Sequence, residues 1–189
     1  MELKGNPMRN PDYRNADPAT AFPRALDAMQ NPGFIKSPRY QEQQKRANRV
    51  GAHPHIVEFA DKLVKRGAQM GIPLFPHCIV RTYEDQMAAY VQGVSRDSPA
   101  DGLWPHKFAA VDIIHGTLAY MDEPIIYNAW AIIGHLGKEV AHSMGIQIEW
   151  GGDWKWRDAA HFELKGWKEI AATGDKWWSP GGSSGTVER

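Results

Sequence analysis

The chain has 189 residues, of which 42% are hydrophobic and 23% are charged, as in an ordinary soluble globular protein with one proper core. Its 22 basic and 22 acidic residues give a formal net charge of zero, which argues against nucleic-acid binding driven by bulk charge. A single cysteine excludes an intramolecular disulfide and a four-cysteine zinc site.

Residues 1–52 are rich in Asn, Pro, Arg and Gln and show little hydrophobic periodicity, although 19–29 and 40–49 have helical potential. We interpret this segment as a loosely packed N-terminal extension or arm. Its basic residues would allow contact with a polyanion, but a solvated arm is the favoured interpretation. No apolar run has the length of a signal peptide or of a membrane span, so we expect synthesis in the cytoplasm without a signal peptide.

A regular pattern begins at His55, and we assign residues 53–178 to one domain. Apolar residues at helical spacing predict a helix that begins near His55 and ends before Gly71. The apolar run 72–80 predicts a strand, and its two prolines favour an edge or irregular strand because proline donates no ladder hydrogen bond. Thr82 predicts the N-cap of a second helix.

The sequence of the rest of the domain predicts strands that alternate with helices. Residues 94–104 are rich in turn formers and predict a loop. The tail 179–189 is rich in Gly and Ser and is expected to be disordered. Strands separated by helices of unequal length predict an α+β fold, with a small antiparallel sheet flanked by helices. The expected elements are strands at 109–114, 146–150 and 161–164, and helices from Pro124 to Met144 and from 167 to 172.

Two short segments carry the candidate chemistry. His106 precedes a predicted strand and Asp112 lies within it, among apolar residues where a carboxylate is costly unless it is paired or binds a metal. About fifty residues later His161 opens another strand, three residues after Asp158. Two imidazoles and a carboxylate suit one zinc ion, and a second carboxylate suits a base that takes a proton from water. A hydrogen-bonded buried Asp112, a surface His106 and a turn-forming Asp158 are the alternatives.

Taken in order, these segments resemble the zinc D,D- and L,D-peptidases that cut peptidoglycan stem peptides. That family includes D-alanyl-D-alanine dipeptidases and the L-alanyl-D-glutamate endopeptidases used as bacteriophage endolysins. The resemblance covers about residues 55–173 and implies a hedgehog/DD-peptidase-like fold. The matching segments are Arg81–Gln86 with Tyr90–Gly93, His106 with Ala110–Ile113, and Trp150–Trp154 with Asp158 and His161–Leu164.

The resemblance also implies roles for single residues. His106, Asp112 and His161 would bind one zinc per chain, although such a ligand set also accepts cobalt or manganese. Asp158 would be the general base and would then protonate the leaving amine. Arg81 would stabilise the oxyanion, with a surface or salt-bridged arginine as the alternative. No organic cofactor is implied.

Two positions depart from the family pattern. The family spaces its His and Asp seven apart, whereas His106 and Asp112 are six apart, and Trp104 stands where the family has Ser. A deletion inside the strand would turn Asp112 to the opposite face, whereas a deletion in the preceding turn lets both side chains converge. We favour the turn because Ala110 to Asp112 is intact. His115 is a weaker candidate ligand, since a spacing of three from Asp112 suits a helix better than a strand.

Three other features complete the expected site. We expect Cys78, in an apolar run, to be a buried packing residue. Asp153 is expected to form a loop or to orient a ligand. Three tryptophans near the second segment either wall a substrate groove or pack around its loop; they are Trp150, Trp154 and Trp156.

The leading hypothesis is a zinc metallopeptidase that hydrolyses peptidoglycan, most of all an L-alanyl-D-glutamate endopeptidase, because Asp at position 158 is typical of that branch of the family. It would be a phage endolysin or virion-associated lysin, a monomer that binds the stem peptide and no nucleic acid. It would act on the cell wall, in the periplasm, after holin release or as part of a virion. The alternatives are a D-alanyl-D-alanine carboxypeptidase or dipeptidase, and a catalytically impaired cell-wall-binding or virion protein, which the shortened spacing motivates.

Overall fold

The computed structural model describes residues 18–120 and 127–180. The expected start of the long helix at Pro124 and residues 181–189 of the tail lie outside these ranges. The elements are α1 (Pro18–Met29), α2 (Pro32–Ile35), α3 (Pro38–Gln44), α4 (Pro54–Gln69), β1 (Leu74–Cys78), α5 (Tyr83–Val91), β2 (Ala110–His115), α6 (Tyr127–Met144), β3 (Ile148–Trp150), β4 (His161–Leu164) and α7 (Trp167–Thr173).

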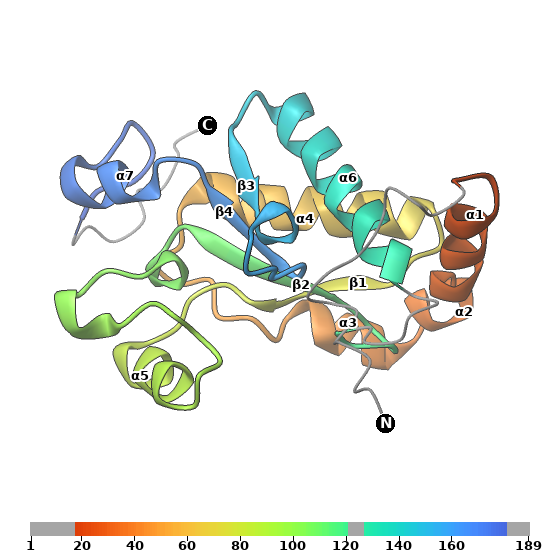
Figure 1. Ribbon diagram of the computed structural model, residues 1–189, viewed down its shortest axis with the longest axis horizontal. Helices are drawn as coiled ribbons and strands as arrows, with labels where there is room; N and C mark the ends of the chain where they lie inside the picture. Colours follow the sequence, from red (N-terminus) through yellow and green to blue (C-terminus); the bar gives the residue numbers. More distant parts are fainter. Residues whose placement is uncertain (1–17, 121–126, 181–189) are drawn as a thin grey trace.

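The four strands form one antiparallel sheet with the order β1-β2-β4-β3. β1 is an edge strand, as the two prolines of the run 72–80 predict, and its pairing with β2 shifts between Pro76 and Cys78. Figure 1 shows the sheet in the middle of the molecule, with α4 and α6 on one side and α5 and α7 near one end. The α+β fold with a small antiparallel sheet is therefore confirmed.

Local sequence signals explain where the helices begin. His53 caps α4, because its Nδ1 accepts a hydrogen bond from the backbone N–H of His55 at 3.1 Å, and Pro54 occupies the first helical position. The predicted cap of α5 is present as well, since the Thr82 hydroxyl accepts from the backbone N–H of Asp85 at 3.2 Å.

One face of the sheet packs on α4 and α6 and forms the core. Phe162 of β4 lies 5.4 Å, centroid to centroid, from Phe59 of α4, and both rings are fully buried. On α6, Gly134 lies against Trp150 and Gly137 against Phe162, at positions where any Cβ would collide with the ring. The absence of side chains there lets α6 approach the sheet closely.

The described part of the N-terminal segment is packed against the domain, which differs from the expected loose arm. Met29 of α1 and Ala47 belong to the main core. The Tyr40 hydroxyl and the Gln44 amide both donate to the Leu74 carbonyl, at 2.8 and 3.0 Å, and so fasten α3 to edge strand β1. The division of the chain at residue 53 stays a prediction. None of the described helices is long and apolar enough to cross a membrane.

Candidate metal centre

Strand register brings the two halves of the predicted site together. Asp112 of β2 and His161 of β4 are direct partners across the antiparallel pair, so their side chains project from the same face. Alternation along the strands sends Val111 and Phe162 to the opposite, core-facing side. The sheet therefore has one apolar face and one face that carries ionisable groups.

His106 reaches this face from a short 3-10 turn, Pro105–Lys107, just before β2. Its Nε2 lies 3.0 Å from Asp112 Oδ1 and 3.2 Å from His161 Nδ1, and those two atoms are 3.1 Å apart. All three side chains are buried. The strand begins only at Ala110, after the turn, so the six-residue spacing still lets His106 and Asp112 meet.

The three donor atoms fit a small divalent cation. A tetrahedral zinc ion with bonds of about 2.0–2.1 Å needs ligand atoms about 3.3 Å apart. The separations here, 3.0, 3.1 and 3.2 Å, are within a few tenths of that value. Two imidazoles and one carboxylate are also the donor types that zinc accepts.

The protonation of the cluster follows from its burial and its charges. Burial lowers the pKa of His106, but the neighbouring Asp112 carboxylate more than offsets it and raises that pKa to about 10. Burial acts likewise on His161, whose hydrogen bonds with Asp112 and Glu163 raise its pKa to about 9. Burial raises the pKa of Asp112, but the two imidazoles more than offset this effect and hold that pKa well below its usual range. A cation among these donors would take the place of their protons.

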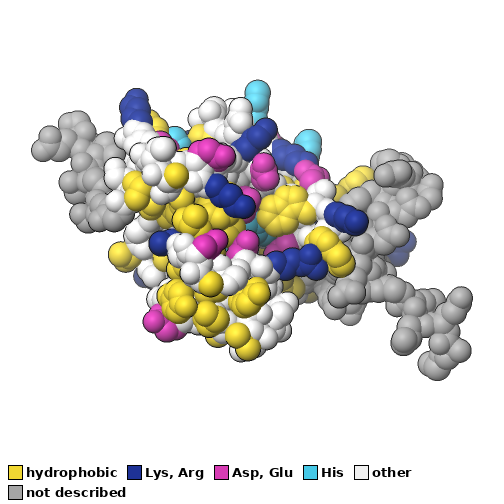
Figure 2. Space-filling model, turned by 60° about the vertical axis from the view of Figure 1, so that its left-hand side comes forward, with side chains coloured by type: hydrophobic (Ala, Val, Ile, Leu, Met, Phe, Trp, Pro, Cys, Tyr) yellow, Lys and Arg dark blue, Asp and Glu magenta, His cyan; other side chains and the backbone are white. Residues whose placement is uncertain are grey.

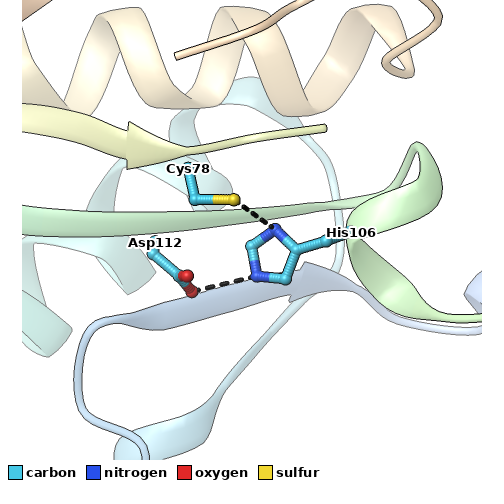
Figure 3. A group of neighbouring side chains, drawn as sticks. All are labelled: Cys78, His106 and Asp112. Atoms are coloured by element: carbon cyan, nitrogen blue, oxygen red, sulfur yellow. Dashed lines mark hydrogen bonds and ion pairs between the residues drawn. The ribbon is translucent and has the colours of Figure 1, made fainter. Parts of the chain in front are cut away.

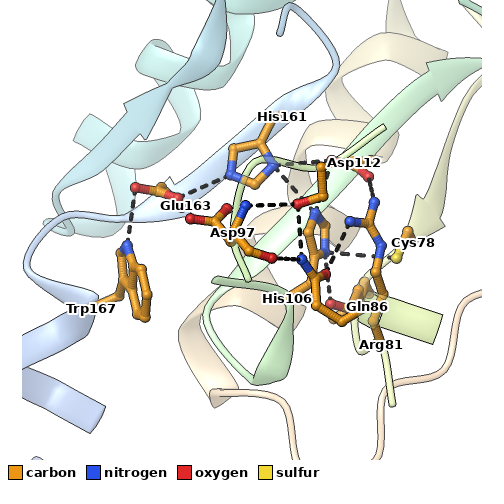
Figure 4. A network of polar contacts seen from close by, with 11 residues as sticks. Cys78, Arg81, Gln86, Asp97, His106, Asp112, His161, Glu163 and Trp167 are labelled. Atoms are coloured by element: carbon orange, nitrogen blue, oxygen red, sulfur yellow. Dashed lines mark hydrogen bonds and ion pairs between the residues drawn. The ribbon is translucent and has the colours of Figure 1, made fainter. Parts of the chain in front are cut away.

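Arg81 and Gln86 support the carboxylate from the side of α5. The Arg81 guanidinium donates to Asp112 Oδ2 at 2.9 Å, and to Gln86 Oε1 in a longer contact of 3.4 Å. The buried Gln86 amide then donates to the Ser95 hydroxyl and to the Asp97 carbonyl, at 2.8 and 2.7 Å. Figure 4 shows this chain of contacts, which joins the loop after α5 to the candidate centre.

Asp158 lies beside His106, Asp112 and His161 but does not belong to the tight donor set, which consists of the three atoms of those residues that lie within 3.2 Å of one another. A carboxylate oxygen of Asp158 lies within 4.8 Å of donor atoms of Asp112 and His161, and its side chain is exposed within the cleft. Partial desolvation and the negative charge of Asp112 raise the pKa of Asp158. Its backbone is held by Gly151, whose carbonyl accepts from the Asp158 N–H at 2.9 Å, and a Cβ on Gly151 would collide with the Asp158 carbonyl.

Cys78 lies closer to the candidate centre than its apolar sequence context predicts. It is partly buried, and its sulfur lies 3.7 Å from His106 Nδ1. With His106, Asp112 and His161 it forms a possible metal-binding cluster, of which Figure 3 shows the Cys78 side. The Nε2 of His106, however, faces Asp112 and His161, while its Nδ1 faces Cys78 and the Ile79 carbonyl. One imidazole nitrogen normally binds one metal ion. A metal bound to His106 Nε2 would therefore be shared with Asp112 and His161, whereas a metal bound to Nδ1 would lie on the side of Cys78.

Two further residues considered in the sequence, His115 and Asp153, lie outside the donor cluster, whereas Glu163 contacts it. His115 is buried at the far end of β2, where its Nε2 donates to the Met29 carbonyl at 2.8 Å. Asp153 pairs with Lys138 on the surface. Glu163, which no sequence argument singled out, is buried and bonded to His161. Its position two residues after His161 on a strand was the available signal, because such residues share a face.

The centre opens into a cleft of about 1250 Å³ that reaches from the loop after α5 to the start of α7. Trp154 and Trp156 line it and are partly exposed, whereas Trp150 is buried in the core. The guanidinium of Arg96 lies 4.0 Å from the centre of the Trp156 ring, which links the two walls. Figure 2 brings this side of the molecule forward and shows basic, acidic and hydrophobic side chains interspersed on it.

The fold and these side chains define an α+β domain with a candidate metal centre on the polar face of its sheet. A solved structure with a similar fold is that of the L-Ala D-Glu endopeptidase ChiX from Serratia marcescens. The match has a TM-score of 0.50 and 21% sequence identity, and it covers 73% of this chain and 92% of that one. At this identity the likeness speaks for the fold alone. No protein-family model and no curated protein sequence matches the chain.

Proposed function

We propose that this protein is a zinc-dependent peptidase that hydrolyses amide bonds in the stem peptides of peptidoglycan. The observation that carries the proposal is the convergence of His106 Nε2, Asp112 Oδ1 and His161 Nδ1 within 3.2 Å of one another at the bottom of an open cleft. The bond between L-alanine and D-glutamate is the proposed target, which the activity named for the structural neighbour and the presence of Asp at position 158 support.

In this proposal His106, Asp112 and His161 hold one zinc ion per chain. A bound zinc supplies Lewis acidity, which polarises a carbonyl group and makes a water molecule more acidic. The buried surroundings of the three donors support this role, because a buried carboxylate and two imidazoles are stable there only when paired with protons or a cation.

Asp158 is the proposed general base. Its carboxylate is within 4.8 Å of donor atoms of Asp112 and His161, and it is exposed to the cleft, where water and substrate arrive. The raised pKa of Asp158 suits a group that accepts a proton from the attacking water and then returns it to the leaving amine nitrogen.

Arg81 is the proposed stabiliser of the oxyanion. It lines the same cleft, and 19% of its side chain is exposed although its Nη2 is committed to Asp112. A guanidinium carries five N–H donors, so the bonds to Asp112 and Gln86 leave others for a substrate oxygen.

The proposed biological setting is the bacterial cell wall, with the protein as a phage endolysin or a virion-associated lysin. The cleft supports a peptide substrate of several residues, because sites for small ligands commonly have volumes of about 300–1,000 Å³ and this cleft is larger.

The test combines metal content with product analysis. We expect about one zinc per purified chain and hydrolysis of purified murein that chelator abolishes and zinc restores. Mass spectrometry of the fragments should find new amino termini at D-glutamate. Release of free D-alanine would instead assign a D-alanyl-D-alanine carboxypeptidase or dipeptidase. If the purified protein binds murein but contains no zinc and does not hydrolyse murein, the proposed enzymatic function is wrong and the protein is a wall-binding protein.

A further inference from the structure

Glu163 is a buried carboxylate at the floor of the cleft for which the proposed reaction has no use. Only 7% of the residue is exposed. It stands on β4 two residues after His161, and so projects from the same face of the sheet. A carboxylate buried to this extent is costly unless hydrogen bonds compensate for the lost water.

Both oxygens of Glu163 are used by ring N–H groups. The Nε2 of His161 lies 3.0 Å from Oε2, and the Nε1 of Trp167 donates to Oε1 at 3.1 Å. An ionised carboxylate can only accept hydrogen bonds, so the hydrogen on this edge of the imidazole must be carried by His161 Nε2. In neutral His161 the lone pair is then on Nδ1, the atom that faces Asp112 and His106.

His106 is held in the same manner from the opposite direction. Its Nδ1 lies 3.0 Å from the Ile79 carbonyl oxygen, which can only accept, and its Nε2 faces Asp112. Each imidazole therefore has an outer N–H fixed by an acceptor and an inner nitrogen directed at the same point. A backbone carbonyl does this for His106, whereas His161 depends on a side chain.

Trp167 in turn fixes Glu163. It is the first residue of α7, follows Gly166 in the left-handed conformation, and is itself buried. Figure 4 shows Trp167 and His161 on opposite sides of the Glu163 carboxylate. The start of α7 is thereby connected to the candidate centre through one hydrogen bond at each step.

We propose that Glu163 is a positioning residue that sets the tautomer and ring orientation of His161 for metal binding, and that Trp167 holds Glu163 in place. The inference rests on the proposed function only as far as the metal centre, and does not depend on the substrate. An outer carboxylate of this kind also makes the ligand nitrogen more basic, and its loss typically weakens metal binding by about 10–100-fold.

The carboxylate cannot be replaced by the isosteric amide without loss. Glutamine offers one acceptor oxygen, while His161 Nε2–H and Trp167 Nε1–H are two donors. In Glu163→Gln either one of these donors loses its partner, or the amide donates to His161 Nε2 and forces the hydrogen onto Nδ1, where it competes with the metal. The shape of the side chain stays the same, so packing is preserved.

The experiment measures zinc affinity of the folded protein by competition with a chromophoric chelator. We expect the dissociation constant to rise about 10–100-fold in Glu163→Gln, and by a smaller factor in Trp167→Phe, which keeps an aromatic side chain, although a smaller one, and removes the N–H. The d–d absorption of the Co²⁺-loaded protein should change in both variants, since ring orientation alters the ligand field. The matched control is Glu169→Gln, the same change on an exposed residue lining the same cleft, which should leave both readouts unchanged.

Circular dichroism of the metal-free variants separates positioning from folding. A purely structural role would lower the unfolding temperature of Glu163→Gln and leave zinc affinity of the folded protein unchanged, which would overturn the inference. Zinc affinity within twofold of the wild type in Glu163→Gln has the same consequence, even if the wild type cleaves murein. If the wild type binds zinc but does not cleave murein, and Glu163→Gln lowers the zinc affinity, the proposed function fails and this inference stands. A wild type that binds no zinc overturns both.

Discussion

Arg81 binds one oxygen of the Asp112 carboxylate and leaves the other oxygen to the two histidines. The Arg81 guanidinium donates to Oδ2 at 2.9 Å, which leaves Oδ1 as the atom that faces His106 and His161. The two oxygens of Asp112 therefore have different partners, and the orientation of the carboxylate is fixed from the side opposite the imidazoles. Arg81 also lines the cleft in which the proposed substrate would bind.

Replacement of Arg81 by lysine should lower kcat for murein fragments by about a hundredfold, because a single ammonium cannot hold Asp112 and Gln86 and still reach a developing oxyanion. Steady-state kinetics with a soluble muropeptide measures the effect. Arg96→Lys is the control, since Arg96 lines the cleft but stacks on Trp156 instead. Equal kcat values for Arg81→Lys and the wild type would contradict the role.

Asp158→Asn should remove hydrolysis while zinc stays bound. Loss of a general base typically costs about 10²–10⁴ in rate, and the tight donor set does not include Asp158. The measurements are murein turnover and zinc per chain on the same preparation. Asp153→Asn, on the same loop but paired with Lys138, should behave as the wild type. Lysis by Asp158→Asn at the wild-type rate would sink the assignment.

Much of the fold follows from periodicity and turn signals in the sequence. The helix at α4, its end before Gly71, the Thr82 cap and the strand at His161 are present as predicted. The packing of the N-terminal segment could not be predicted in this way. It depends on single side chains, such as the Tyr40 hydroxyl on Leu74, rather than on an amphipathic stripe with a readable period.

The candidate site was predictable only in part, for physical reasons. The meeting of Asp112 and His161 depends on strand register, which the apolar alternation on the opposite face determines. The position of Cys78 depends on the register shift between Pro76 and Cys78, which makes it the partner of Asp112. Such irregularities have no clear periodic signal, so the thiol beside His106 could not be anticipated.

Cys78→Ser should leave zinc affinity within about twofold of the wild type. The sulfur faces His106 Nδ1, whereas the nitrogen shared with Asp112 and His161 is Nε2. Chelator competition on the two proteins checks this directly. A large loss of affinity would instead assign the metal to the group Cys78, His106 and Asp112.

Removal of zinc should destabilise the protein, because the ion binds the folded state and not the unfolded chain. At free zinc about a hundredfold above its dissociation constant, binding contributes about 2.7 kcal/mol. For a chain of this size that corresponds to a shift of roughly 5–10 °C in the unfolding temperature. Differential scanning calorimetry with and without chelator measures it, and His161→Ala should show no such shift. A chelator-insensitive wild type would argue against a metal in the buried cluster.

Acid should destabilise the protein through His115, the last residue of β2, which is not one of the proposed zinc ligands. Its Nδ1 accepts from the backbone N–H groups of Thr117 and Leu118, at 3.2 and 3.0 Å, while Nε2 donates to Met29. Burial lowers the pKa of His115 below 6.5, and the Met29 carbonyl only partly opposes this. Protonation of Nδ1 would break both backbone contacts, so the folded state keeps His115 neutral.

The sign of the effect follows from which state binds the proton first. Below pH 6.5 His115 is protonated in the unfolded chain but not in the folded protein. The free energy of unfolding therefore decreases as the pH is lowered, by up to about 1.4 kcal/mol per pH unit, until the pH reaches the pKa of His115 in the folded state. In His115→Gln, whose amide still donates to Met29, the decline between pH 6.5 and 5 should be shallower than in the wild type, although stability at pH 7 is lower. Urea unfolding across this range measures the difference, with His135→Gln on the exposed side of α6 as control. Parallel pH profiles for His115→Gln and the wild type would assign the acid sensitivity to other groups.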